Sequence, residues 1–138
     1  MPREKSQPGG TGMLLLSLLS RREMYGYEMI AALEARSDHT FTLKEGTLYP
    51  VLHQLEKEGA VTCYEKQAPT GRVRKYYHIT RKGLRLLGEK REEWRQFSRL
   101  VDAITASGRA ALEAQREQWN AYAAGVRGVL EGGVTCGA

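Results

Sequence analysis

The sequence predicts a mainly α-helical fold with one small β-hairpin, a long helix after the hairpin and a further helix near the C-terminus. Three observations support this fold class. Apolar residues recur with helical spacing from residue 13 onward. Two runs rich in β-branched and aromatic residues, joined by a turn with Pro and Gly, interrupt that spacing at residues 61–79. A seven-residue apolar repeat then continues along the chain.

Size and charge limit the function. With 138 residues and 41% apolar content, the chain has room for one domain plus an appendage. The segment from Lys66 to Arg91 contains nine Lys or Arg and one acid, so its charge is +8. The rest of the chain has a charge of −3, which gives the whole chain its net charge of +5. This local concentration of positive charge predicts a polyanionic partner.

The cysteines and the apolar runs indicate the compartment. Cys63 and Cys136 are far apart, so we expect neither a disulfide framework nor a zinc site, but a reducing, cytoplasmic environment. The apolar run from Met13 to Leu19 is too short to span a bilayer. We interpret it as a core helix and expect no membrane partner, with a cleaved signal peptide as the weaker alternative.

The first part of the chain predicts an arm and two helices. Residues 1–12 are rich in Pro and Gly and lack periodicity, which predicts a flexible N-terminal arm. The apolar segment from Met13 to Arg22 predicts a helix, and its burial on both sides suggests a contact beyond its own fold. A second helix opens at Tyr25-Gly26-Tyr27-Glu28 and continues to Ser37.

The stretch from Thr42 to Val61 predicts a third helix around which the fold is organised. Thr42 and Glu45 have the spacing of a capping box, which places the helix start near Leu43. Gly59 is the expected left-handed residue that ends the helix. One face of the helix is apolar and consists of Leu48, Val51, Leu52 and Leu55.

The opposite face of this helix carries Gly46, Pro50, His53, Gln54 and Lys57. Gly and Pro are both unfavourable inside a helix, and Pro50 removes a hydrogen bond to the Gly46 carbonyl. Their position on the free face indicates a surface that a partner approaches closely. A kinked surface helix is the alternative interpretation.

A cationic hairpin follows directly. Strands at 61–66 and 72–79 flank the turn at 67–71. Cations on a hairpin can serve solubility alone. A helix with a free face followed by a cationic hairpin is, however, the arrangement of a winged helix, which places the helix in the major groove and the hairpin on phosphates or in the minor groove. Residues 13–80 are therefore the expected DNA-binding domain.

The remaining residues, 81–131, predict a helical dimerisation region. Thr80 caps a helix from Arg81 to about Ser107, roughly 40 Å long at 1.5 Å per residue. A coiled-coil-like seam on this helix exceeds what one small domain covers, so we expect a homodimer. A second helix follows Gly108, and residues 132–138 are expected to fray. The seam residues are Leu87, Trp94, Phe97, Val101 and Ile104.

Three segments resemble the PadR family of bacterial transcriptional regulators. They are MYGYEMIAALE at 24–34, EGTLYPVLHQLEKEGAV at 45–61 and GRVRKYYHITRKGLRLL at 71–87. The resemblance covers residues 13–100. It implies a winged helix-turn-helix with a long dimerising helix, in a protein that represses genes for detoxification or drug efflux until an effector releases it.

The resemblance also implies functional residues. Gly46, Thr47 and Tyr49 are the expected DNA-facing positions, with Lys44 at the helix entrance. Trp94 and Phe97 are either packing residues of the seam or part of an effector pocket between subunits, because some relatives hold flat aromatic compounds there. The full expected DNA-binding set is Tyr25, Tyr27, Lys44, Gly46, Thr47, Tyr49, Pro50, His53, Gln54, Thr70, Gly71, Arg72, Arg74 and Lys75.

The sequence offers little for catalysis. GxSxG, HExxH and phosphate-loop motifs are missing from the 138 residues, and the three histidines fall in three different elements. His53 is either a base-reading or a solvated residue. We therefore expect no enzyme, no metal and no cofactor, but a homodimeric repressor of a pseudo-palindromic operator with a small, aromatic effector. The alternative is a winged helix that binds an acidic protein.

Overall fold

The computed structural model describes residues 10–106 and 113–136. Residues 1–9, most of the expected N-terminal arm, lie outside the described residues, but Thr11 and Gly12 already belong to the first helix. No helix in the described ranges is long and apolar enough to cross a membrane. In chain order the elements are α1 (Thr11–Leu19), β1 (Met24–Tyr25), α2 (Gly26–Arg36), α3 (Glu45–Lys57), β2 (Val61–Gln67), β3 (Val73–Ile79), α4 (Arg81–Ala106) and α5 (Glu113–Cys136).

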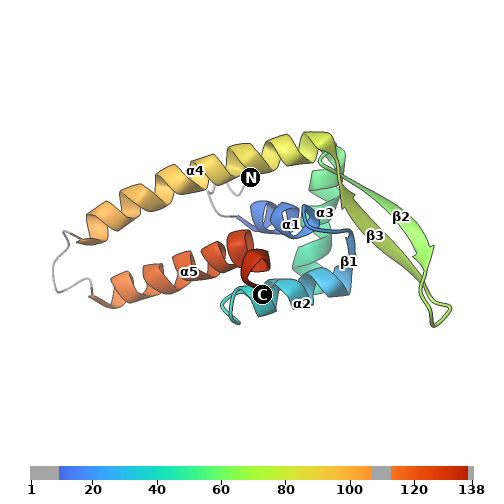
Figure 1. Ribbon diagram of the computed structural model, residues 1–138, viewed down its shortest axis with the longest axis horizontal. Helices are drawn as coiled ribbons and strands as arrows, with labels where there is room; N and C mark the ends of the chain where they lie inside the picture. Colours follow the sequence, from blue (N-terminus) through green and yellow to red (C-terminus); the bar gives the residue numbers. More distant parts are fainter. Residues whose placement is uncertain (1–9, 107–112, 137–138) are drawn as a thin grey trace.

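Helix α1 lies at the centre of the molecule. It is placed between the long helices α4 and α5, with the small sheet at one end of the molecule (Figure 1). The contact beyond its own fold that the sequence suggests is supplied by α5 of the same chain. The Arg21 guanidinium donates a hydrogen bond to the Leu130 carbonyl at 3.0 Å, and the buried Ser17 hydroxyl lies 3.5 Å from the Val129 carbonyl.

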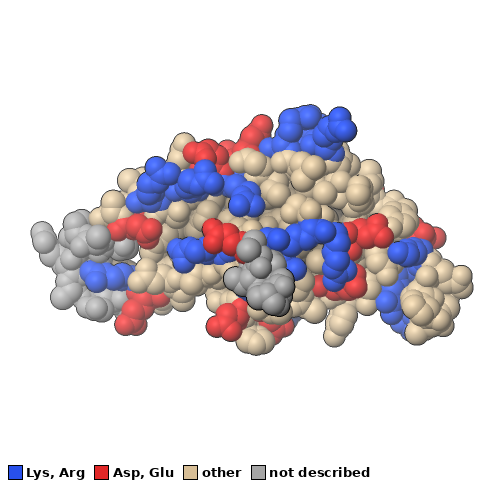
Figure 2. Space-filling model, in the orientation of Figure 1, with Lys and Arg blue, Asp and Glu red and all other residues tan. Residues whose placement is uncertain are grey.

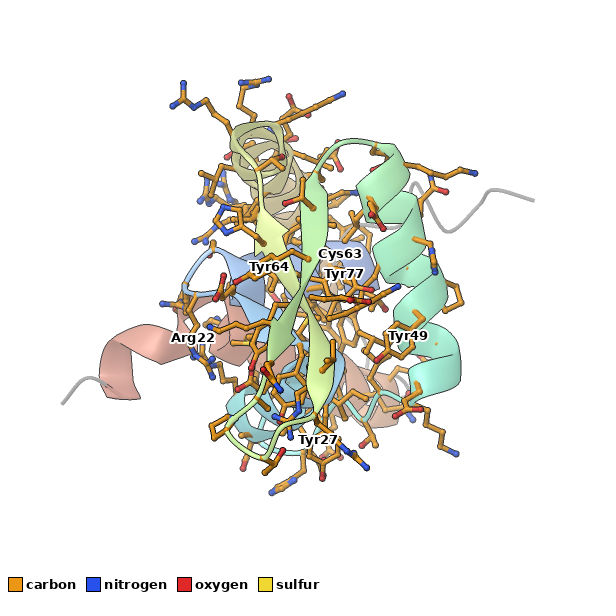
Figure 3. All side chains as sticks on the ribbon, turned by 90° about the vertical axis from the view of Figure 1, so that its right-hand side faces the viewer. Arg22, Tyr27, Tyr49, Cys63, Tyr64 and Tyr77 are labelled. Carbon is orange, nitrogen blue, oxygen red and sulfur yellow. The ribbon has the colours of Figure 1, made fainter. Side chains whose placement is uncertain are left out.

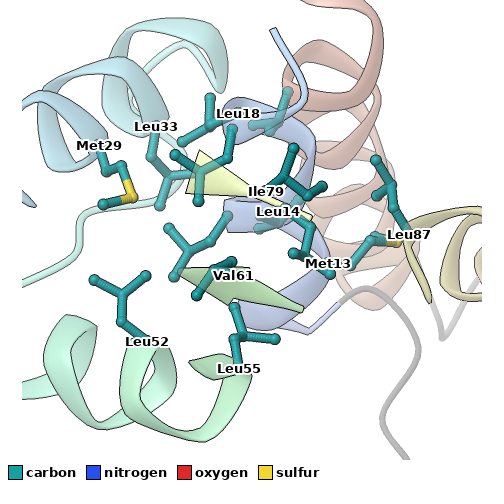
Figure 4. Packing of buried hydrophobic residues seen from close by; sticks show 14 of the residues in the cluster. Met13, Leu14, Leu18, Met29, Leu33, Leu52, Leu55, Val61, Ile79 and Leu87 are labelled. Atoms are coloured by element: carbon teal, nitrogen blue, oxygen red, sulfur yellow. The ribbon is translucent and has the colours of Figure 1, made fainter. Parts of the chain in front are cut away.

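The core joins the winged head to the two long helices. Leucines of α1 meet Leu52 and Leu55 of α3, Val61 and Ile79 of the sheet, and Leu87 of α4 (Figure 4). Each fully buried side chain of this kind contributes about 1.5–3 kcal/mol. The core therefore fixes one face of α3 and leaves the other free.

Helix α3 begins at Glu45, later than the sequence predicts. The expected capping box is wrong: Thr42 is exposed, and Lys44 at the N-cap position makes no side-chain cap hydrogen bond. Residues 41–44 are not helical: Phe41 and Leu43 pack inward, and the Phe41 N–H donates to the Ser37 hydroxyl at 3.0 Å. Tertiary packing thus overrides the local capping signal. At the other end the prediction is confirmed, since Gly59 has φ 79°.

The hairpin is part of a three-stranded antiparallel sheet in the order β1-β3-β2. The hairpin itself is confirmed, and Tyr77 and Ile79 pack on the core as predicted. Strand β1 is not predicted, because the sequence pattern at Tyr25 indicates the start of a helix. Two residues are too few to show a period of two. Their pairing with β3 places Tyr25 opposite Tyr76.

Part of the α4 seam is covered within the chain. The cap is confirmed, because the Thr80 hydroxyl accepts the Gly83 N–H at 3.0 Å. Leu87 is buried, and Trp94 is only 7% exposed against α5, so the expectation that one chain cannot cover the seam is wrong for these two residues. Further along, Leu100 and Ile104 remain 60% and 57% exposed.

Helix α5 extends to Cys136, so residues 132–136 are helical rather than frayed as predicted, and 137–138 lie outside the described residues. Extending an existing helix costs less than starting one. Its glycines permit close packing: a Cβ at Gly128 would overlap the Arg36 carbonyl oxygen, and one at Gly125 would lie 3.0 Å from Thr40. Helix α5 therefore packs directly against the end of α2 and the turn that follows.

Candidate nucleic-acid interface

The free face of α3 is confirmed as an open surface. Leu48, Leu52 and Leu55 are buried on the opposite side, whereas nothing lies within 4 Å of a Cβ placed at Gly46. A partner can therefore approach the backbone of α3 closely at this point. The predicted DNA-facing residues that are exposed on α3 or at its entrance are Lys44, Gly46, Thr47, Pro50, His53 and Gln54.

Tyr49 does not lie fully on this face. Its side chain is half-buried, and its hydroxyl lies so close to Gly26 that any side chain at position 26 would overlap it. Figure 3 shows Tyr49 on the sheet-facing side of α3. Tyr49 thus joins α3 to the start of α2. Sequence spacing does not predict this contact, for which Gly26 is the local signal.

The tip of the hairpin is a closed turn. The Ala68 N–H donates to the Arg72 carbonyl at 2.7 Å, and the Gly71 N–H donates to the Ala68 carbonyl at 2.8 Å. Gly71 has φ 91°, a conformation that favours glycine. Thr70, Gly71 and Arg72 are exposed as a result. Tyr27, 68% exposed, lies at the same end of the molecule as this tip (Figure 3).

The pleat of the sheet separates the cations of the hairpin. Lys75 lies opposite Glu65 on the side that continues the core face. Arg74 and Lys66, which are also paired, project from the outer side together with three tyrosines. The Arg74 guanidinium lies 4.3 Å from the centroid of the Tyr25 ring, and the Lys66 Nζ lies 5.0 Å from that of Tyr76. Tyr25 is half-buried in this arrangement.

An acid on the outer side was not found by the sequence analysis. The Tyr64 hydroxyl donates a hydrogen bond to the Glu23 carboxylate, and Lys66 lies 3.4 Å from the same carboxylate. These contacts lower the pKa of Glu23, with the Tyr64 hydrogen bond as the main cause. The same hydrogen bond raises the pKa of Tyr64 to about 12. Strand β1, which was also missed, holds this end of the chain next to the hairpin.

The basic segment divides into two surface patches. One covers the hairpin, and the other covers the first turns of α4, where Arg81, Lys82 and Arg85 are exposed (Figure 2). The first turn of α4 contains no acidic residue, although the positive end of a helix favours one. The positive charge therefore does not lie wholly on the hairpin.

The predicted dimer and effector residues form part of an aromatic cluster inside one chain. The Trp94 ring lies 5.6 Å from Trp119, 5.9 Å from Tyr122 and 6.1 Å from Phe97. The Trp119 indole donates to the Asp102 carboxylate at 2.8 Å. Packing thus accounts for Trp94, whereas Phe97 and Ile104 are exposed and Val101 is half-buried.

Within residues 10–106 and 113–136, no three His, Cys, Asp or Glu side chains are placed to hold a metal ion. His39 Nδ1 lies 3.1 Å from the Glu34 carboxylate.

The fold and the site define a winged helix-turn-helix protein: three helices, a free face on the third and a cationic hairpin after it. Residues 15–89, more than half of the chain, match the family described as the transcriptional regulator PadR-like family. The chain belongs to this family of transcriptional regulators, which are not enzymes.

Two curated relatives show the range of similarity. A protein of Lysinibacillus sphaericus, named Uncharacterized protein X, is 34% identical over 94 residues, which cover 68% of this chain and 86% of the relative. Transcriptional regulator YqjI of Escherichia coli is 28% identical over 95 residues, which cover 69% of this chain. The chain spans less than half of YqjI, at 44% of its length.

Solved structures agree with the fold. A transcriptional regulator from Clostridium thermocellum matches with a TM-score of 0.64 at 31% identity, over 70% of this chain and 93% of that one. A PadR family transcription regulator from Clostridium difficile matches with a TM-score of 0.57 at 34% identity, over 67% of this chain and 94% of that one. Helix α5 lies outside the family match.

Proposed function

We propose that this protein is a homodimeric transcriptional repressor that binds a pseudo-palindromic operator and is released by a small aromatic effector. The observation that supports this most is the open face of α3 beside a cationic hairpin, in a chain of a transcriptional regulator family. The two surfaces have the chemistry of two kinds of DNA contact: polar side chains for bases and cations for phosphates.

Helix α3 enters the major groove in this proposal. Thr47, His53 and Gln54 are exposed and offer the donors and acceptors that base edges recognise. Arg72, Arg74 and Lys75 contact phosphates and supply affinity without sequence choice. Each neutralised phosphate adds about 0.9 to the slope of log affinity against log salt concentration.

The dimer forms through the exposed apolar residues of α4 that follow Trp94. Phe97, Leu100 and Ile104 recur at intervals of three and four residues, so they share one face of the helix. Exposed apolar stripes of this kind mark interaction sites in soluble proteins. A second copy covers the stripe, and the two heads meet two half-sites related by a twofold axis.

The effector binds beside the aromatic cluster, at Phe97, a residue that is 38% exposed next to Trp94. A flat aromatic compound stacks favourably on such rings. Binding there changes the angle between the heads and hence their spacing on DNA. Titration with aromatic compounds is expected to quench tryptophan emission and to release labelled operator at the same concentrations, whereas quenching without release would contradict an effector role.

DNA binding is tested with duplexes selected from a random pool and measured by fluorescence anisotropy at several salt concentrations. Joint replacement of Arg72 and Arg74 by Ala is expected to weaken binding to every sequence and to reduce the salt slope by about 2. Arg127→Ala, an exposed change on α5, is the control and should keep the slope. An unchanged slope in the double variant contradicts the role of the hairpin.

The same experiment addresses the alternative function. Strong retention on heparin together with equal binding to all duplexes favours an acidic protein partner over an operator. The dimer is tested by sedimentation of a protein with Leu100→Asp and Ile104→Asp, for which we expect the mass of a monomer. A wild-type protein that sediments as a monomer contradicts the dimer.

A further inference from the structure

Three tyrosines form a row across the outer side of the sheet. They come one from each strand, because Tyr25 of β1 and Tyr64 of β2 both pair with Tyr76 of β3. The rings of Tyr25 and Tyr76 meet edge to face at 5.4 Å, and those of Tyr76 and Tyr64 stack at 6.1 Å. The row is thus a continuous aromatic surface across the middle of the cationic hairpin.

The two outer cations of the hairpin are held on this row in different ways. Lys66 lies over Tyr76 but also pairs with the Glu23 carboxylate at 3.4 Å. Arg74 lies over Tyr25, and no ion pair with an acid is found for it among residues 10–106 and 113–136. Within this part of the chain, Arg74 is therefore restrained by a ring and not by a carboxylate.

A ring and a carboxylate restrain an arginine with different consequences. A carboxylate neutralises the guanidinium and occupies its N–H groups, which must then be released before they bind a phosphate. A ring contacts the flat face of the guanidinium and leaves the N–H groups at its edge available. An arginine held in this way also loses less conformational freedom when it binds.

We propose that Tyr25 is a positioning residue for DNA binding, whose ring holds Arg74 with its charge and its N–H groups directed to a phosphate. This inference rests on the proposed function. It assigns Tyr25 a different role from the direct DNA contact that the sequence analysis expects, because the half-buried ring lies beneath Arg74. The role needs the ring and does not need the hydroxyl.

Two substitutions at position 25 distinguish the two roles. Tyr25→Phe keeps the ring and should bind operator as tightly as the wild type. Tyr25→Leu removes the ring and should weaken binding about two- to fivefold, the range of an exposed cation–π contact, at every salt concentration and with an unchanged slope. Equal loss in both variants, or no loss in Tyr25→Leu, overturns the proposal.

Arg74→Lys provides a test that leaves the Tyr25 ring intact. Lysine keeps the charge but lacks the planar group that stacks on the ring. We expect the same two- to fivefold weakening with an unchanged salt slope. Wild-type affinity in this variant overturns the proposal, because charge alone would then suffice.

A measurement without DNA separates this inference from the proposed function. In NMR spectra of the free protein, the ring current of Tyr25 should shift the side-chain protons of Arg74 upfield. The shift should persist in Tyr25→Phe and disappear in Tyr25→Leu. Tyr27→Leu is the matched control, since Tyr27 is exposed two residues further along the chain, and should leave the shift unchanged. Arg74 signals at random-coil positions in the wild type overturn the positioning role even if the protein binds its operator.

Discussion

The winged head is held differently on its two sides. On the side of α5, buried apolar residues and glycines fit closely, and Val126 and Val129 are fully buried. On the outer side of the sheet, rings, cations and one acid meet in contact with solvent. Close packing therefore fixes the position of α3, whereas weaker contacts beside solvent orient the side chains on the outer side of the sheet.

The α5 side supports an unfavourable turn. Asp38 and His39, between α2 and α3, have φ values of 55° and 65°, in the left-handed region that non-glycine residues rarely adopt. Such residues persist when their surroundings hold them in place. Here Phe41 packs edge to face on Tyr122 of α5 at 5.4 Å, and Gly128 approaches the Arg36 carbonyl. Helix α5 thus supports the turn that orients α3.

The largest effect is expected at Gly128. Gly128→Ala places a methyl group on the Arg36 carbonyl oxygen and should lower the free energy of unfolding by about 1–3 kcal/mol, the usual cost of overpacking. Gly88→Ala on α4 is the matched control, because open space surrounds that position and alanine should stabilise the helix by about 0.5–1 kcal/mol. Urea denaturation measures the free energy of unfolding of both variants. If Gly128→Ala stabilises the protein as Gly88→Ala does, α5 is not closely packed at Gly128.

An intermediate effect is expected at Phe41. Phe41→Ala removes the ring pair with Tyr122, about 0.5–1.5 kcal/mol beyond the buried area, and should speed hydrogen exchange of the amides between α2 and α3. Val73→Ala on the hairpin, where the side chain is exposed, should change neither the free energy of unfolding nor the exchange rate of these amides. If exchange in the turn remains slow without the Phe41 ring, α5 does not support it.

The smallest effect is expected from Glu23 on the exposed side. Because the pKa of Tyr64 is raised to about 12 in the folded state, its hydrogen bond stabilises the fold fully below pH 10 and is lost as pH rises toward 12. The lowered pKa of Glu23 matters at acidic pH. The contribution of Glu23 to stability is present above pH 4.5 and is lost as pH falls through the pKa of Glu23 in the folded state.

Glu23→Gln should therefore bring the ionisation of Tyr64 back toward pH 10, which an absorbance titration of the tyrosines at alkaline pH detects. Tyr77 is the internal control, since burial is the main cause that raises its pKa to about 12, and its ionisation should remain late. An unchanged titration would mean that Glu23 does not hold Tyr64 in solution.

The sequence allowed prediction of those features that local spacing determines. The two faces of α3, the hairpin, the cap at Thr80 and the glycine at 59 each depend on residues within a few positions of one another. The capping box at Thr42 failed because Phe41 and Leu43 make contacts that local spacing does not reveal.

The missed features all join residues that are distant in the chain. Tyr49 meets Gly26, Trp94 meets Trp119, and Tyr25 meets Arg74, and in each case helical or strand spacing indicates a face but no partner. The short strand β1 belongs to the same group, since it exists only through its pairing with β3. These pairings determine how the candidate site is held, and local spacing could not predict the contacts of Tyr25 with Arg74 or of Tyr49 with Gly26.

The aromatic cluster also gives the protein an optical property. Its two tryptophans, Trp94 and Trp119, lie 5.6 Å apart on α4 and α5, and the sequence contains no others. Emission excited selectively at tryptophan therefore reports the contact between the long helices and not α3 or the hairpin, whose fluorescent residues are tyrosines. With a dye on the duplex, the approach of DNA and the movement of α5 can be followed at separate wavelengths in one sample.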